Sequence, residues 1–158
     1  MRIHIETVIP APPEVVFDLA RNLEAHTEST GDTDEKVISG PESGMMELGD
    51  EVTFEARHFG IRQRLTSKIV AYERPVHFTD RMLKGAFAHL EHQHLFVAEG
   101  LGTLMIDIMD VEAPLGALGK VFEAVILRNY MTAFIEKRAD SLKLMAEELL
   151  EEQSRKKG

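Results

Sequence analysis

Polar and apolar residues alternate along the middle of the chain, a pattern typical of β-strands that bury one face. In residues 51–58 the alternation places Val52, Phe54 and Ala56 on one face and mostly charged residues on the other. The same period of two recurs at 3–7, 61–71, 76–82, 87–96 and 103–109, and a short apolar pair stands at 37–38. Because turns containing Gly or Pro separate several of these segments, we predict a first strand and a later six-stranded antiparallel meander with one buried face, about seven strands in all.

Helical spacing replaces the alternation near both ends of the chain. Residues 11–20 begin with prolines, which the first turn of a helix tolerates, and carry an apolar stripe. A second short helix is predicted over 21–29. Beyond Ala113–Pro114 and up to residue 152, apolar residues recur at spacings of about 3.6, which predicts a helix on the order of 50 Å long. We therefore expect a single α+β domain over 1–152 and a charged C-terminal tail over 153–158.

Composition narrows the class of protein. The chain of 158 residues is 44% hydrophobic and 28% charged, which is typical of one globular domain. Its formal net charge of −9 argues against nucleic acid as a partner, because nucleic-acid-binding proteins gather Lys and Arg on one face. The absence of cysteine excludes disulfides, cysteine metal sites and thiol nucleophiles. No apolar stretch approaches the roughly 18 residues of a membrane-spanning helix, and the N-terminus lacks the apolar core of a signal peptide, so a cytoplasmic protein is expected.

Two histidines and a carboxylate fall on the predicted inward face of the last two strands. In residues 87–96 the alternation places His92 and His94 on the same face as large apolar residues. In residues 103–109 it places Asp107 between two inward methionines. Ionisable groups among Leu, Phe and Met indicate either a buried hydrogen-bonded network or a ligand cavity with a few polar anchors.

The same groups are candidates for catalysis. A histidine with an ordinary pKa of about 6.5, beside a carboxylate, can move a proton at physiological pH. The candidate acid–base residues are His92, His94, Asp107 and Asp80. Mutual hydrogen bonding of buried polar groups is the simpler interpretation of all of them. No Ser or Lys stands in a known nucleophile motif, so acyl-enzyme chemistry is not expected.

A metal site is not predicted. Two histidines two residues apart on a strand share a face, and a carboxylate on the next strand would complete three ligands of the kind that zinc accepts. The His-x-His pattern is short, however, and nothing in the sequence fixes a fourth ligand. We expect no metal and no other cofactor.

Inward positions on the sheet and the long helix are the candidate walls of a cavity. Aromatic residues and methionines can form such walls, and methionine adapts to ligands of irregular shape, but both are also ordinary core residues. For the inward polar residues Gln63 and Ser67, local hydrogen bonding is the simpler interpretation. The candidate ligand-binding residues are Phe54, Gln63, Ser67, Phe78, Asp80, Met82, His92, His94, Phe96, Met105, Asp107, Phe122 and Met131.

Several local motifs, taken in order, resemble one branch of a known superfamily. They are residues 49–58, Arg74–Pro75 with Phe78 and Asp80, Phe87 with 92–94 and Phe96, 102–107, 113–119 and 128–131. Together they resemble the START and birch-pollen-allergen superfamily, in its bacterial branch of polyketide cyclase/dehydrase-like (SRPBCC) proteins. The resemblance implies a helix-grip fold, in which a curved antiparallel sheet of about seven strands wraps around a long C-terminal helix. Two short helices would follow the first strand.

The resemblance also implies an apolar cavity between sheet and helix. Members of the superfamily bind lipids, sterols, polyketides or plant hormones there, and some catalyse cyclisation or dehydration. Because fold alone does not settle function, several hypotheses stay open. The first is binding of a small apolar molecule that is lipid-like, aromatic or polyketide-like. The second is a cyclase or dehydratase in which His92 or His94 acts with Asp107 or Asp80.

The third hypothesis is an interaction module without small-molecule chemistry. Leu104, Ile106 and Ile108 fall on the face opposite Asp107. Three outward aliphatic side chains in a row need a cover, such as a second copy of the chain. A homodimer through this face is one interpretation, and an error in the strand register is the alternative.

Overall fold

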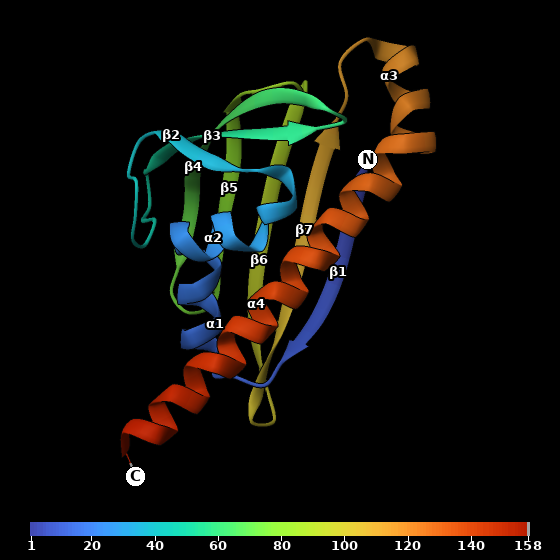
Figure 1. The fold of residues 1–158 in the computed structure, drawn as a ribbon. Coiled ribbons are helices and arrows are strands. Elements are labelled where there is room, and N and C mark those ends of the chain that lie inside the picture. Colours follow the sequence, from blue (N-terminus) through green and yellow to red (C-terminus); the bar gives the residue numbers. More distant parts are fainter. Residues whose placement is uncertain (158) are drawn as a thin grey trace.

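A seven-stranded antiparallel sheet curves around the C-terminal helix in the computed structural model, which describes residues 1–157 (Figure 1). The strand order across the sheet is β1-β7-β6-β5-β4-β3-β2, so β2 to β7 form a meander and β1 pairs with β7. The strands are β1 (Arg2–Ile9), β2 (Lys36–Ser39), β3 (Glu51–His58), β4 (Ile61–Glu73), β5 (His77–Lys84), β6 (His89–Glu99) and β7 (Gly102–Glu112). The predicted meander and its helix-grip arrangement are confirmed.

Two short helices, α1 (Pro13–Ala20) and α2 (Leu23–Ser29), follow β1, and a 3-10 turn (Gly31–Thr33) leads on to β2. Proline at the start of α1 is tolerated because the first N–H groups of a helix have no intrahelical partner. Asn22 separates the two helices, since its side chain accepts a 2.8 Å hydrogen bond from the backbone N–H of Ala25 and caps α2.

The C-terminal helical region contains a π-helical turn that the sequence pattern does not predict. It consists of α3 (Gly116–Phe122), a π-helical turn (Glu123–Leu127) and α4 (Arg128–Lys157), which lies across the sheet in Figure 1. The helix α4 continues through 153–157, the described part of the segment that we interpreted as a tail, and residue 158 lies outside the described residues.

A β-bulge in β4 changes which side chains face the core. The register with β5 shifts between Ile69 and Ala71, so one extra residue stands in β4. Tyr72 therefore points inward, where its ring packs edge-on against Phe17 at 5.4 Å between centroids. Strict alternation over 61–71 would place Tyr72 on the opposite face, because alternation does not anticipate a bulge.

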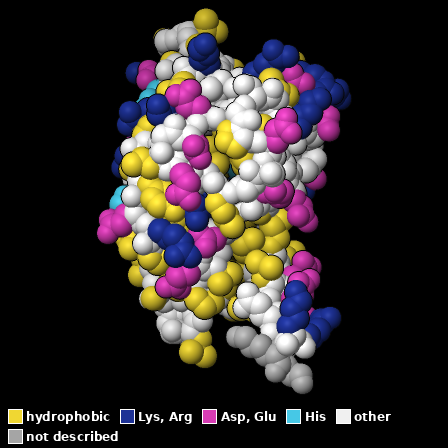
Figure 2. All heavy atoms as spheres, turned by 90° about the vertical axis from the view of Figure 1, so that its left-hand side faces the viewer, with side chains coloured by type: hydrophobic (Ala, Val, Ile, Leu, Met, Phe, Trp, Pro, Cys, Tyr) yellow, Lys and Arg dark blue, Asp and Glu magenta, His cyan; other side chains and the backbone are white. Residues whose placement is uncertain are grey.

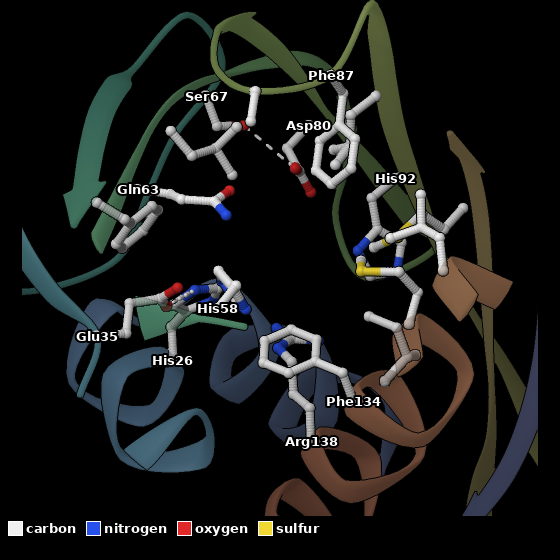
Figure 3. Close-up of a pocket in the computed structure, with 18 of the residues that line it drawn as sticks. His26, Glu35, His58, Gln63, Ser67, Asp80, Phe87, His92, Phe134 and Arg138 are labelled. Atoms are coloured by element: carbon white, nitrogen blue, oxygen red, sulfur yellow. Dashed lines mark hydrogen bonds and ion pairs between the residues drawn. The ribbon is translucent and has the colours of Figure 1, made fainter. Parts of the chain in front are cut away.

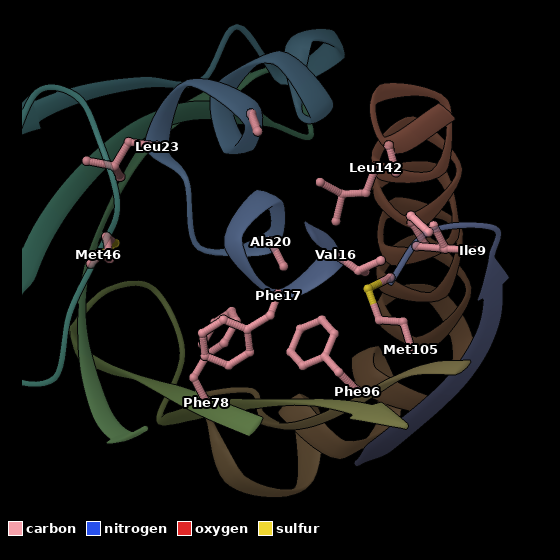
Figure 4. Packing of buried hydrophobic residues seen from close by; sticks show 14 of the residues in the cluster. Ile9, Val16, Phe17, Ala20, Leu23, Met46, Phe78, Phe96, Met105 and Leu142 are labelled. Carbon is pink, nitrogen blue, oxygen red and sulfur yellow. The ribbon is translucent and has the colours of Figure 1, made fainter. Parts of the chain in front are cut away.

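Phe17 of α1 is central to the larger of two core clusters (Figure 4). Its buried ring lies edge-on at 5.4 Å from the ring of Phe78 and 5.2 Å from that of Phe96. The same cluster includes Leu142 of α4 and Met105 of β7. The second cluster consists of Ile3, Leu90, Met109, Val111, Ala113, Leu127, Met131 and Ile135. Both clusters contribute walls to the cavity described below.

The outer face of β7 carries the aliphatic row that the sequence places there. Leu104, Ile106 and Ile108 are half-buried, while the alternate residues of the strand are buried. Val8 and Val97 pair with Leu104 from the two neighbouring strands, and their exposed fractions are 54% and 49%. The homodimer through this face stays a prediction.

Figure 2 shows the face that carries α1 and α2. Lys and Arg lie among Asp and Glu over most of it, and apolar side chains gather beside the end of α4, which projects from the body. Among residues 1–157, no helix combines the length and apolar character needed to cross a membrane.

Candidate functional site

A cavity of about 510 Å³ lies between the sheet and α4 (Figure 3). Its walls come from β3 to β7, from α2, and from α3 and α4. Most of the lining side chains are apolar, and a few polar groups converge from opposite walls, including Gln63 and Asp80 on the sheet and Arg138 on α4. A largely apolar hollow with a few convergent polar groups is the usual form of a small-molecule site.

Apolar side chains also mark the opening of the cavity. Phe59, Leu115, Leu118 and Phe122 line the cavity and are at the same time exposed. The exposed fractions of Leu115 and Leu118 reach 80% and 76%. An apolar molecule that enters would therefore meet apolar surface before it meets the polar groups inside.

Strand pairing brings two histidines and two aspartates together in the wall. β6 lies between β5 and β7, and its register sets His92 opposite Asp80 and His94 opposite Asp107. The hydrogen bonds run diagonally to these pairs. His92 Nε2 lies 2.9 Å from Asp107 Oδ1, and His94 Nε2 lies 3.1 Å from Asp80 Oδ2. His94 Nδ1 is also 2.9 Å from the same Asp107 oxygen, at ion-pair distance, so Asp107 holds both rings.

Both carboxylates of this cluster are ionised at neutral pH. Burial raises the pKa of Asp107, but hydrogen bonds with His92 and His94 outweigh burial and lower it far below its usual range. Burial likewise raises the pKa of Asp80, and the hydrogen bond with His94, together with nearby positive charge, lowers it to about 2. A buried negative charge at Asp107 and a half-buried one at Asp80 therefore stand beside the imidazoles.

The pKa values of the two histidines shift in opposite directions. Burial and the charge of His94 lower the pKa of His92, and the attraction of Asp107 does not offset them. Burial also disfavours charge on His94, but its interactions with Asp107 and Asp80 raise its pKa above the usual value. The pair therefore carries its proton preferentially on His94. Neutral His92 donates through Nε2 to Asp107, which leaves its Nδ1 as an acceptor.

Residues 1–147 match the family described as polyketide cyclase/dehydrase and lipid transport. The chain belongs to this family. The resemblance to the START and birch-pollen-allergen superfamily is thereby confirmed. No curated protein matches the sequence.

Solved structures show the family fold. The chain is similar to TTHA0849 from Thermus thermophilus, with 20% identity, a TM-score of 0.75 and coverage of 90% of this chain and 94% of that chain. It is similar to a START superfamily protein from Mycobacterium smegmatis, with 15% identity, a TM-score of 0.71 and coverage of 94% and 98%. Ginseng major latex-like protein 151 from Panax ginseng gives 15% identity, a TM-score of 0.69 and coverage of 92% and 97%.

This member of the polyketide cyclase/dehydrase and lipid transport family places most of the predicted ligand-binding residues in the cavity wall. They are Phe54, Gln63, Ser67, Phe78, Asp80, His92, His94, Phe122 and Met131. Met82, Phe96, Met105 and Asp107 are not among the residues that line the cavity. Phe96 and Met105 belong to the larger core cluster, and Met82 packs against the second. Asp107 is 1% exposed and lies behind His92, to which it is bonded.

Two further polar pairs in the wall were missed by the sequence analysis. His26 Nε2 of α2 lies 2.6 Å from Glu35 Oε1, and His58 Nδ1 lies 2.6 Å from the hydroxyl oxygen of Tyr130. Burial raises the pKa of Glu35, but the charge of His26 and its hydrogen bond lower it below its usual value. The alternation in β3 could have identified His58, because two residues after Ala56 it places His58 on the same face.

Arg138 is the third polar group that the sequence analysis missed. It lies on α4, its exposed fraction is 4%, and it lines the cavity. The signal was its position, four residues after Phe134 and four before Leu142, on the apolar stripe of the helix. A charged residue on such a stripe points to a buried partner or a ligand.

Asp80, His92 and His94 place one ligand atom each within 4.8 Å of one another. The geometry could admit a small cation, but His92 and His94 already bond to Asp107 and Asp80. We assign no metal to this cluster.

Replacing Asp107 tests the charge that holds the two rings. Asp107→Asn keeps the size and one acceptor oxygen, and we expect it to lower the free energy of unfolding by about 2 kcal/mol or more, since a buried charge-assisted bond is lost. Chemical denaturation measures this difference. The matched control is Asp110→Asn on the same strand, whose exposed pair with Arg2 should contribute about 1 kcal/mol or less.

The difference between wild type and Asp107→Asn should also depend on pH. The folded pKa of Asp107 is lowered, so its contribution is present above the unfolded aspartate pKa of about 3.9 and is lost as the pH falls towards the folded value. The folded pKa of His94 is raised, so the contribution of its charge is present below the unfolded histidine pKa of about 6.5 and is lost as the pH rises through the folded value. The difference should therefore be largest between about pH 4 and pH 6.5. A difference that is constant from pH 3 to pH 9 would contradict this assignment.

Proposed function

We propose that this protein binds a small, predominantly apolar molecule in the cavity between the sheet and α4. The observation that carries the proposal is the cavity itself, at about 510 Å³. Protein interiors are close-packed and rarely leave voids much larger than a water molecule. A hollow of this size, within the range of about 300–1,000 Å³ that small-molecule sites occupy, supports binding rather than ordinary packing.

The arrangement of the walls indicates how the ligand lies. Aromatic and aliphatic side chains cover most of the cavity and its opening, so the body of the ligand is apolar. Asp80, His92 and His94 stand together on one wall and orient a polar group of the ligand by hydrogen bonds. The family description, which includes lipid transport, agrees with this proposal.

Filling the cavity should abolish binding. The probe is 1-N-phenylnaphthylamine, an uncharged apolar dye whose fluorescence rises in apolar surroundings. Met131 lies on α4 and lines the cavity, so a Met131→Trp side chain would occupy its space. We expect the wild type to bind the dye and Met131→Trp to bind it at least about tenfold more weakly, a loss of about 1.4 kcal/mol.

Leu144→Trp is the matched control, because Leu144 lies on the same helix, is 61% exposed and is not among the lining residues. It should leave the dye affinity unchanged. Absence of dye binding by the folded wild type, or equal affinities for Met131→Trp and Leu144→Trp, would refute the proposal.

Acid–base catalysis is the second candidate function, and the state of His92 favours it. The ring is neutral by virtue of its lowered pKa, it is oriented by Asp107, and it lines the cavity. A neutral imidazole held by a carboxylate is the arrangement of a general base. Its substrate would carry an enolisable carbon beside a carbonyl group.

Proton exchange at such a carbon gives a direct assay. If the second function holds, the protein should accelerate deuterium exchange at the α-carbons of 2-tetralone in D2O, and His92→Gln should reduce the rate to background. Proton NMR follows the exchange. A rate equal to background for the wild type, with 2-tetralone bound, would leave binding as the function and exclude this catalysis.

A further inference from the structure

Arg138 is a buried cation with an incomplete set of partners. Its guanidinium extends from α4 towards the cavity in Figure 3, and the residue is 4% exposed. Nη2 donates a 3.0 Å hydrogen bond to the carbonyl oxygen of Ala20. Nε and Nη1 are buried and have no hydrogen-bond partner among the described residues. Buried polar groups are nearly always bonded, so these two nitrogens call for a further acceptor.

The second arginine in the cavity wall, unlike Arg138, has carboxylate partners for its guanidinium. Arg21 is 9% exposed and also lines the cavity. Its nitrogens donate to Asp18 at 3.0 and 2.8 Å, to Glu47 at 2.7 Å and to the carbonyl of Met46 at 3.1 Å. The fold therefore pairs the charge of Arg21 with two carboxylates, and Arg138 has no carboxylate within ion-pair distance in the described part of the chain.

The acidic groups of the cavity wall already have partners. Glu35 bonds to His26 at 2.6 Å and accepts from Thr30 at 3.0 Å. Asp80 bonds to His94 and accepts from Ser67 at 3.1 Å. The N–H groups of Arg138 that lack an acceptor therefore find none among these carboxylates, although the charge of Arg138 acts on Asp80.

A carboxylate is the acceptor that fits the N–H groups of Arg138 best. It carries one negative charge and planar oxygen acceptors, which match the N–H groups of a guanidinium. A phosphate, with up to two charges, would face the nearby Asp80 and Glu35 with greater repulsion. Water could also accept from the N–H groups, but a neutral acceptor would not form the stronger charge-assisted bond that a carboxylate forms.

We propose that the ligand is an apolar carboxylic acid whose ionised carboxylate binds Arg138, while its apolar body fills the rest of the cavity. This inference rests on the proposed function, since it names the chemical class of the molecule bound there. In this inference, the charge of Arg138 makes the site bind an ionised acid more tightly than a neutral molecule of the same shape.

Matched ligands test the inference. Decanoate and decan-1-ol share the same chain and differ in charge, and each is titrated below its aggregation limit against bound 1-N-phenylnaphthylamine at pH 7.5. We expect wild-type protein to bind decanoate at least about tenfold more tightly than the alcohol, as a charge-assisted bond in a buried site should give. In Arg138→Met the preference, taken as the ratio of the two affinities, should fall to about one.

Two further variants complete the experiment. Arg128→Met removes a positive charge from an exposed position on the same helix and should keep the full preference for decanoate. Arg138→Gln is neutral but polar, and it replaces Arg138→Met if that variant does not fold by circular dichroism.

The outcomes separate the inference from the proposed function. Equal affinities of the wild type for decanoate and decan-1-ol, with the dye bound, would overturn the inference and leave the proposed function intact. A preference for decanoate that survives in the neutral variants would overturn the assignment to Arg138. A wild type that binds neither dye nor ligand would overturn the proposed function, and with it this inference.

Discussion

The site depends on one buried carboxylate. Asp107 is 1% exposed, yet it stays ionised because His92 and His94 both reach its Oδ1 at 2.9 Å. The cost of burying a charge is offset only when partners surround it, and here the partners are held in place by the registers of the three strands. Asp107 in turn fixes the ring of His92, so that a neutral acceptor stands in the cavity wall.

The two core clusters lie on either side of the cavity. In the larger cluster Phe17 of α1 packs against Phe78 and Phe96, and the second cluster includes Leu127 and Met131. Each cluster supplies close-packed contacts, which stabilise the domain without filling the space between them. Asp80, His92 and His94 are placed by strands and Arg138 by a long helix, which favours a site of fixed shape.

The sequence predicts which side chains of a strand point inward better than it predicts which of them line the cavity. Alternation placed His92, His94 and Asp107 inward, because a strand with one buried face repeats every two residues. It could not show that Met105 packs under α1, since that depends on where a helix distant in sequence covers the strand. The position of Arg138 on the apolar stripe of its helix was a signal in the sequence, but its two nitrogens without a hydrogen-bond partner are visible only in three-dimensional contacts.

The central claim is that Asp107, which contacts both rings, and Asp80, which bonds only to His94, divide the charge of the histidine pair unequally. A nitrogen-15 NMR titration of both imidazoles, assigned with the single variants His92→Gln and His94→Gln, measures this division most directly. We predict that His94 titrates above the ordinary histidine pKa of about 6.5, that His92 titrates below it, and that neutral His92 carries its proton on Nε2. Two rings that titrate together near 6.5, or a neutral His92 with its proton on Nδ1, would contradict the account.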